Sequence, residues 1–223
     1  MKKSLCAIMT LWIFAIGCPA AAAQEFLPYR DRTGGHDVSI EIVEEILPEG
    51  SIMHSRMSNG EIHDVWLDAS TVTISYHVVS PARKIDYTVT RDGSILHVKG
   101  MFAGSPISKT ITISGQPWYE SIERSIHDYI VTGETRPLPF WIVNPWDANA
   151  YLLEAQFEGK KLITVNDRRV MAVRIRVGPT GLLRLFWSSL YWFRPEDGRF
   201  LRYEAVRGLP GTPKTVVEYM GSD

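Results

Sequence analysis

The stretch "YWFRPEDGRFLRYE", residues 191–204, decides how the rest of the chain is interpreted. Three consecutive aromatic residues lead into a charged turn, and a second apolar run follows. Asp197-Gly198 supplies residue types that tolerate the positive φ of a tight turn. Residues 195–198 are therefore predicted to be a hairpin turn between two antiparallel strands, and such a unit favours a sheet built from hairpins.

The same turn chemistry recurs along the chain, at Glu49-Gly50, Asn59-Gly60, Asp92-Gly93, Glu158-Gly159 and Asn166-Asp167. Between these signals, apolar and β-branched residues alternate with polar ones. Val72, Ile74, Tyr76 and Val78, for example, are separated by Thr73, Ser75 and His77. A period of two indicates strands with one buried face. The pattern predicts an antiparallel meander rather than a parallel sheet with helical crossovers.

One segment has a different period. In "PWYESIERSIHDYIVTG", residues 117–133, Trp118, Ile122, Ile126 and Ile130 recur every four positions. This spacing predicts one amphipathic helix near residues 117–131 that lays its apolar stripe on the sheet. The predicted fold class is thus mainly β (α+β), a curved antiparallel meander sheet or half-barrel packed around one amphipathic helix.

The first 23 residues have the pattern of a secretory signal peptide. Lys2 and Lys3 precede an apolar run over residues 5–16, which is too short to span a bilayer, and small residues follow up to Ala23. Cleavage after Ala23 predicts an exported, periplasmic protein. An alternative uses Cys18, which follows Gly17 as in a lipoprotein signal, and lipidation there would tether the protein to the outer membrane.

Residues 24–36, "QEFLPYRDRTGGH", mix Pro, Gly-Gly and charges without a period, and they are interpreted as a leader or linker. Residues 37–223 are then predicted to form a single β-rich domain. No apolar run in the mature chain reaches the roughly 20 residues of a transmembrane helix. With 24 basic against 25 acidic residues, the composition does not indicate a nucleic-acid partner.

No pattern along the chain carries a recognisable reaction. The six histidines show no HxH or HxxxH spacing, so no metal site is predicted. There is no GxSxG elbow and no Gly-rich phosphate loop, and no cofactor is expected. A non-enzymatic protein is favoured, and a hydrolase with an unrecognised site is the least favoured alternative.

The run "LLRLFWSSLYWF", residues 182–193, is apolar on both faces, and such a strand must be covered on both faces. The cover on the second face could be the helix, another subunit or a ligand. Aromatic side chains supply large apolar contact area at low entropic cost. The predicted ligand-binding residues are therefore the aromatic residues of this strand and two near the helix: Trp187, Tyr191, Trp192, Phe193, Trp118 and Trp141.

The runs "PWYESIERSI", "FWIVNPWD", "EGKKLITVNDRRVMAVRIRV" and "GLLRLFWSSLYWFRPEDGRFLRYEAVRG" resemble an uncharacterised family of exported bacterial β-rich domains. More distantly, the plan of strands curved around a helix resembles the lipoprotein-carrier half-barrels of the bacterial envelope. The resemblance implies an envelope protein with an apolar groove, and it supplies no catalytic residue.

Together these patterns predict an envelope protein that holds a lipid, acyl chain or other apolar ligand in a groove between sheet and helix. The alternative is a structural or adaptor protein that binds another envelope protein through its aromatic patch or an edge of its sheet.

Overall fold

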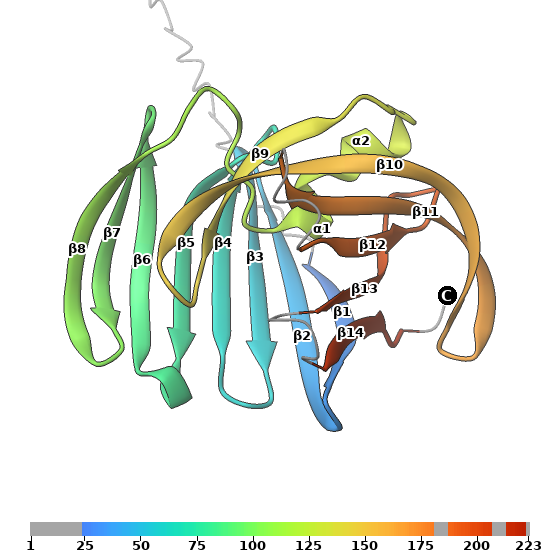
Figure 1. Ribbon diagram of the computed structural model, residues 1–223, viewed down its shortest axis with the longest axis horizontal. Helices are drawn as coiled ribbons and strands as arrows, with labels where there is room; N and C mark the ends of the chain where they lie inside the picture. Colours follow the sequence, from blue (N-terminus) through green and yellow to red (C-terminus); the bar gives the residue numbers. More distant parts are fainter. Residues whose placement is uncertain (1–23, 181–186, 207–212, 222–223) are drawn as a thin grey trace, which may run out of the picture.

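The computed structural model describes residues 24–180, 187–206 and 213–221. The predicted signal peptide with Cys18, and residues 182–186 of the aromatic run, lie outside the described residues. The chain forms one 14-stranded antiparallel sheet with the order β8-β7-β6-β5-β4-β3-β2-β1-β14-β13-β12-β11-β10-β9 (Figure 1). The prediction of a mainly β, curved antiparallel meander is confirmed.

The strands are β1 (Gln24–Thr33), β2 (His36–Leu47), β3 (Gly50–Met57), β4 (Ile62–Asp68), β5 (Thr73–Ser80), β6 (Ile85–Asp92), β7 (Ile95–Phe102), β8 (Ser105–Thr112), β9 (Leu138–Asn144), β10 (Asn149–Val165), β11 (Arg168–Pro179), β12 (Ser189–Phe193), β13 (Phe200–Val206) and β14 (Lys214–Tyr219). The helices are the 3₁₀ turn η1 (Pro81–Arg83) and the short helices α1 (Ile122–Ser125) and α2 (His127–Val131).

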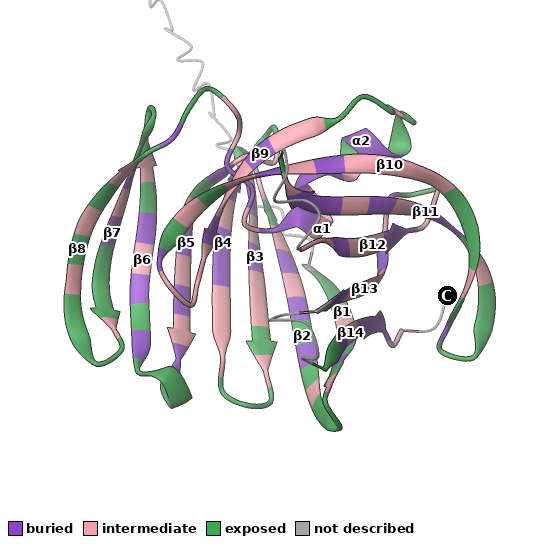
Figure 2. Ribbon diagram, in the orientation of Figure 1, coloured by how far each residue is buried: buried purple, intermediate pink, exposed green. Residues whose placement is uncertain are grey.

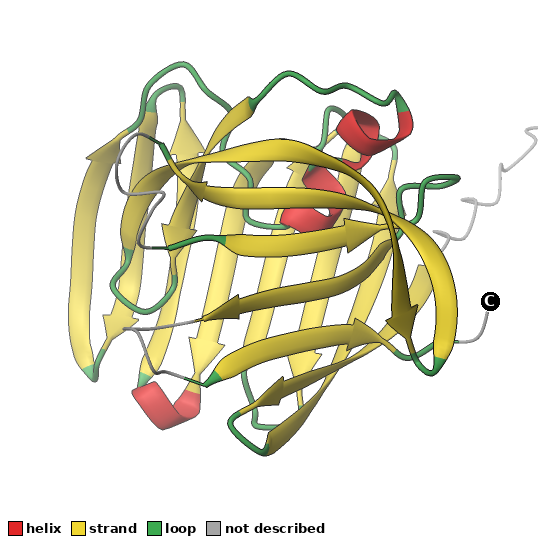
Figure 3. Ribbon diagram, turned by 45° about the vertical axis from the view of Figure 1, so that its right-hand side comes forward, coloured by secondary structure: helices red, strands yellow, loops and turns green. Residues whose placement is uncertain are grey.

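The sheet bends into two facing walls, and its first and last strands pair in its middle. β1 pairs with β14, so β1–β8 form one wall and β9–β14 the other. The walls face each other across the interior, and the short helices lie between them at one end (Figure 3). β8 and β9 remain the free edges of the sheet, which is therefore unclosed.

The segment before the helices joins the two walls at a seam. Trp118 forms an isolated parallel bridge with Trp141 on β9. The Trp141 amide donates to the Pro117 carbonyl over 2.7 Å, and the Thr73 amide at the start of β5 donates to the Trp118 carbonyl over 2.9 Å. These bonds satisfy backbone groups of both walls. The seam therefore pairs some of the backbone groups that would be left unpaired in an open sheet and that a closed barrel would pair.

Glu120 lies at the seam. Its Oε1 accepts hydrogen bonds from Trp118 Nε1 and from the Val143 amide of β9, both over 2.5 Å. Its own amide donates to Thr73 Oγ1 over 2.9 Å. Burial raises the pKa of this carboxyl from 4.5 to about 8, because charging it inside the protein carries a desolvation cost that the two N–H donors offset only in part.

The prediction of one amphipathic helix over residues 117–131 is wrong. Residues 117–120 are extended, because their backbone pairs with β5 and β9 instead of continuing a helix. α1 and α2 are separated by Ile126, whose φ of −98° and ψ of 12° interrupt the helix. The apolar stripe is nevertheless buried, with exposures of 0–5% at Trp118, Ile122, Ile126 and Ile130. We call α1 and α2 together the plug.

The structure also differs from the prediction of a leader at residues 24–36. This segment forms β1 and the turn into β2, and β1 pairs along its length with β2 and, from Tyr29 on, with β14. Tyr29 is 3% exposed in the main core. Pro28 and the charged residues obscured the alternation, because Glu25 and Asp31 lie on the same face of β1 as Tyr29, while Arg30 and Arg32 lie on the other face.

Five of the predicted turn pairs lie at hairpin turns, but Glu158-Gly159 does not. β10 runs through this pair, and the register with β11 shifts there by one residue. Gly159 has a φ of 92°, as a bulge tolerates. Bulges and turns use the same glycine chemistry, so sequence alone does not separate them. The extra residue exchanges the two faces of β10: Leu153 and Ala155 face the main core, whereas Ile163 and Val165 face the other way.

The bulge explains how the aromatic strand is covered on both faces. On the inner face, Phe193 is fully buried in the main core. On the outer face, Trp192 forms a second cluster with Val165, Ala172 and Leu201. The long β10–β11 hairpin curls around the end of its wall, and buried bands continue into it (Figures 1 and 2). The second cover is thus the sheet's own hairpin. In the described ranges, no helix has the length and hydropathy needed to cross a membrane.

Candidate functional site

A cavity of about 300 Å³ lies beneath the plug, at the end of the molecule where β1, β2 and β3 meet the turn between β12 and β13. This volume is at the lower end of the roughly 300–1,000 Å³ typical of small-molecule sites. Its lining comes from five segments: Glu25, Leu27 and Tyr29; Ile42 and Glu44; Met53; Glu123, Arg124 and His127; and Asp197, Gly198, Arg199 and Phe200.

The floor of the cavity is apolar. Ile42 and Met53 are 6% and 3% exposed, and the Tyr29 and Phe200 rings pack at 5.3 Å between centroids. The Tyr29 hydroxyl donates to the Phe200 carbonyl over 3.3 Å, so its polar tip is satisfied within the protein. Burial, and next the charge of Glu123, raises the pKa of Tyr29 well above its usual range, so the floor carries no charge at neutral pH.

The rim of the cavity is charged, and both of its guanidinium groups are already paired. Arg124 Nε lies 2.7 Å from Glu44 Oε1. Arg199 lies 2.7 Å from Glu25 and 3.8 Å from Asp197, and it donates to Tyr219 Oη over 3.1 Å. Asp197 also accepts hydrogen bonds from Arg194 over 2.8 and 2.5 Å. The four acidic residues Glu25, Glu44, Glu123 and Asp197 therefore face three arginines. The balance of the rim is negative unless an acid is protonated.

Glu123 on α1 is the carboxyl without a cationic partner among the described residues. Ser121 Oγ donates to it over 3.0 Å. Burial raises the pKa of Glu123 from its ordinary value of 4.5. A carboxyl in this setting can accept a hydrogen bond from a ligand hydroxyl or pair with a ligand amine.

The plug is held over the cavity by polar contacts to both walls. Ser125 Oγ donates to the Thr71 carbonyl over 2.9 Å, and Thr71 Oγ1 donates to the Ser125 carbonyl over 3.1 Å. On the opposite wall, His127 Nε2 lies 3.0 Å from the Asp197 carbonyl. The plug thus joins the two walls above the cavity, and its side chains Ile122, Ile126 and Ile130 are buried in the main core.

The six residues predicted to bind a ligand do not line this cavity, and they do not form one surface. Tyr191 and Phe193 stack inside the barrel at 6.3 Å, whereas Trp192 lies on the opposite face of the sheet. Trp118 and Trp141 meet at the seam, and Trp187 is half-buried against the main core. The aromatic strand reaches the cavity indirectly, because Phe193 packs against Phe200 at 5.7 Å between centroids.

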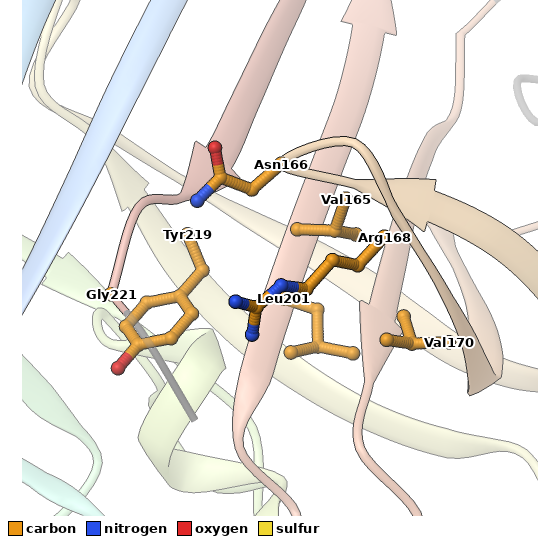
Figure 4. A pocket seen from close by; sticks show the side chains of 7 residues that line it. All are labelled: Val165, Asn166, Arg168, Val170, Leu201, Tyr219 and Gly221. Carbon is orange, nitrogen blue, oxygen red and sulfur yellow. The ribbon is translucent and has the colours of Figure 1, made fainter.

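A second cleft is too small to bind a ligand. It lies between the tip of the β10–β11 hairpin and the C-terminal strands, where Val165, Arg168, Leu201 and Tyr219 converge (Figure 4). Its volume of about 20 Å³ holds roughly one water molecule. Within the described parts of the chain, no three His, Cys, Asp or Glu side chains gather as a metal site requires.

The overall fold has a solved counterpart. The crystal structure of a β-barrel-like protein of the domain of unknown function DUF1849 from Brucella abortus superposes with a TM-score of 0.55, at 10% identity, over 92% of this chain and 99% of that one. This chain has a β-barrel-like fold.

A DUF1329 family protein from Desulfovibrio piger is matched at a TM-score of 0.29 and 10% identity, over 91% of this chain and 85% of that one. No family model and no curated protein matches the chain. The likeness to the Brucella abortus protein, at 10% identity, shows the fold alone.

Sequence reasoning missed the residues that form this cavity. Tyr29 lies in the segment predicted to be a leader, and Asp197 lies in the predicted hairpin turn. Glu123 lies in the segment predicted to be one amphipathic helix. One signal was available: Phe200 follows the turn directly, and it continues the aromatic run across the hairpin.

Proposed function

We propose that this protein is an exported, non-enzymatic protein of the cell envelope that binds a small amphipathic ligand in the cavity beneath the plug. The observation that carries the proposal is the division of the cavity into an apolar floor, formed by Ile42, Met53 and Phe200, and a charged rim. Such a division matches a molecule with an alkyl chain and one polar head. Export rests on the signal-peptide pattern of residues 1–23.

The rim favours a head group that is neutral or cationic. Arg124 and Arg199 are engaged by Glu44 and Glu25, so neither offers an unpaired cation to a ligand carboxylate. Glu123 can accept a hydrogen bond from a hydroxyl or ammonium group. We therefore expect an alkyl alcohol or alkyl amine to bind more tightly than the fatty acid of equal length.

The test is displacement of the fluorescent probe 1-N-phenylnaphthylamine from the purified protein by decanol, decylamine and decanoate at pH 7.5. We expect decanol and decylamine to compete at roughly tenfold lower concentrations than decanoate, a difference of about 1.4 kcal/mol. Glu123→Gln removes the carboxylate while keeping an acceptor oxygen. In this variant, the concentrations at which decylamine and decanoate displace the probe should become more similar.

Leu27→Trp is the variant that locates the site. Leu27 is half-buried on the wall of the cavity, so a tryptophan there fills the space without disturbing the deep core. We expect probe binding to weaken at least tenfold. Ile74→Trp is the matched control, because Ile74 is 48% exposed on the outer face of β5. Equal binding by Leu27→Trp, Ile74→Trp and the unchanged protein would exclude the cavity as the site.

A further inference from the structure

The β10–β11 hairpin curls away from the rest of the second wall, and its tip lies at the end of this curl (Figure 1). The tip carries exposed apolar side chains. Leu162 and Met171 are both 49% exposed. They are direct partners in the antiparallel register, so their side chains lie on the same face with Cβ atoms about 5 Å apart. Together they form a continuous apolar spot rather than two isolated residues.

The bulge at Gly159 determines which side chains this face presents. Beyond it, Ile163 and Val165 turn toward Trp192 and Leu201, where the hairpin packs on its own sheet. The Arg202 guanidinium donates to the Thr164 carbonyl over 3.3 Å, which fixes the hairpin in that position. The side chains on the opposite face of the tip are exposed. This face holds Lys160, Leu162, Thr164, Arg169 and Met171, and we call it the tip face.

The hairpin tip is also a local concentration of positive charge. Residues 160–171 contain four basic residues and one acid, whereas the whole chain has a formal net charge of −1. Lys160 and Arg169 lie on the tip face, and Lys161 and Arg168 flank it from the other side. All four are exposed, and none forms an ion pair within the part of the chain that the structure describes.

The base of the same hairpin shows the contrast. Arg174 and Arg176 both pair with Glu158, at 2.7 and 2.5 Å. The two arginines next to the sheet thus share one carboxylate within the molecule, whereas the four basic side chains at the tip have no such partner among the described residues. The tip therefore combines basic side chains that lack an acidic partner in the described parts of the chain with the apolar side chains of Leu162 and Met171. A surface with negative charges outside and an apolar layer beneath them would be complementary to it.

We propose that the tip face docks this protein on an anionic lipid membrane. Lys160 and Arg169 would contact lipid phosphates, and Leu162 and Met171 would enter the boundary between head groups and acyl chains. Lysine and arginine can bury their methylene stems while their charges stay at the head groups. Apolar burial and attraction to anionic lipid add together in such surfaces. This inference does not depend on the ligand in the cavity.

The test is flotation of the protein with vesicles of phosphatidylcholine alone and with vesicles that contain phosphatidylglycerol. All proteins carry Cys18→Ala, so that a lipid anchor at residue 18 cannot contribute. We expect binding to the phosphatidylglycerol vesicles at low salt, little binding to phosphatidylcholine, and loss of binding at high salt. One basic residue near such a surface contributes about fivefold, so Lys160→Gln with Arg169→Gln should weaken binding roughly twentyfold.

The double variant Leu162→Ser with Met171→Ser removes the apolar side chains and keeps every charge. It therefore separates the insertion of apolar side chains into the membrane from electrostatic attraction to anionic lipid. We expect it to weaken binding to phosphatidylglycerol vesicles roughly tenfold without changing the thermal midpoint. Ile74→Ser, on a residue of nearly equal exposure in the other wall, should bind as the parent does.

Three outcomes would overturn the proposal. One is equal binding to both kinds of vesicle, and another is unchanged binding by both tip variants. The third is no vesicle binding by the parent together with tip-dependent crosslinking to an envelope protein, which would make the tip face a protein-binding surface.

Discussion

The two walls of the sheet bury their residues in different ways. β1–β8 form a wall with one face toward the core and one toward solvent, as in the alternating exposure of β5 and β6. In the wall from β9 to β14, β12 is packed on both faces, on the main core and beneath the curled β10–β11 hairpin. A strand that is apolar on both faces therefore does not require a ligand or a second subunit to cover its second face. A bulge can supply the cover from the same sheet.

The largest effect is expected inside the second wall. Phe193→Ala should lower the free energy of unfolding by about 3–5 kcal/mol, because Phe193 is fully buried among Tyr191, Phe200 and the main core. Trp192→Ala should cost less, because the small outer cluster can settle around the lost side chain. Chemical denaturation measures the free energy of unfolding of both variants. A larger loss in Trp192→Ala than in Phe193→Ala would mean that the outer cluster, and not the inner one, is the main core.

The bulge can be tested on its own. Gly159→Val places a β-branched residue at a φ of 92°, where no atom would clash with its Cβ, so the cost is backbone strain alone. We expect a loss of about 1–3 kcal/mol in the free energy of unfolding and weaker protection of the Trp192 cluster in hydrogen exchange. Unchanged stability would mean that the hairpin does not need this geometry.

The seam between the walls predicts a pH dependence. The pKa of Glu120 is raised to about 8 in the folded state against 4.5 as its ordinary value. The folded protein therefore holds this proton more tightly than the unfolded chain does, and stability falls as pH rises from 4.5 to 8. Glu120→Gln stays neutral throughout.

Thermal melts from pH 5 to pH 8 measure this effect. Between pH 5 and pH 8, the melting temperature of the unchanged protein should fall further than that of Glu120→Gln. Each 1 kcal/mol of lost stability lowers the melting temperature by about 2–4 °C. Parallel curves for the two proteins would show that Glu120 is not the responsible group.

The smallest effect on stability is expected at the tip face. Leu162→Ser with Met171→Ser should change the free energy of unfolding by less than about 0.5 kcal/mol, because both side chains are half-exposed. Chemical denaturation of this double variant and of Trp192→Ala compares the exposed tip face with the buried face of the same hairpin. A loss comparable to that of Trp192→Ala would mean that the tip face is core.

The sequence predicted what depends on local pattern. Alternation over residues 72–78 predicted β5, and the turn chemistry at Asp92-Gly93 and Asp197-Gly198 predicted hairpins where the structure has them. Ile74 breaks the alternation and is 48% exposed, because the register of β5 with β4 shifts at this residue. The helix was wrong because Trp118 finds backbone partners at Thr73 and Trp141, which are close in space and distant in sequence. The cavity could not be predicted for the same reason: Tyr29 and Phe200 meet across 171 residues.

The most direct test of the central claim is photo-crosslinking with a long-chain alcohol that carries a diazirine near the end of its alkyl chain, followed by peptide mapping. The account predicts labelling of the cavity floor, on the peptides that contain Met53 and Phe200, and loss of that labelling in Leu27→Trp. Labelling concentrated on Trp187 and Trp141, with the cavity peptides unmodified, would contradict it and would return the site to the aromatic residues that the sequence first suggested.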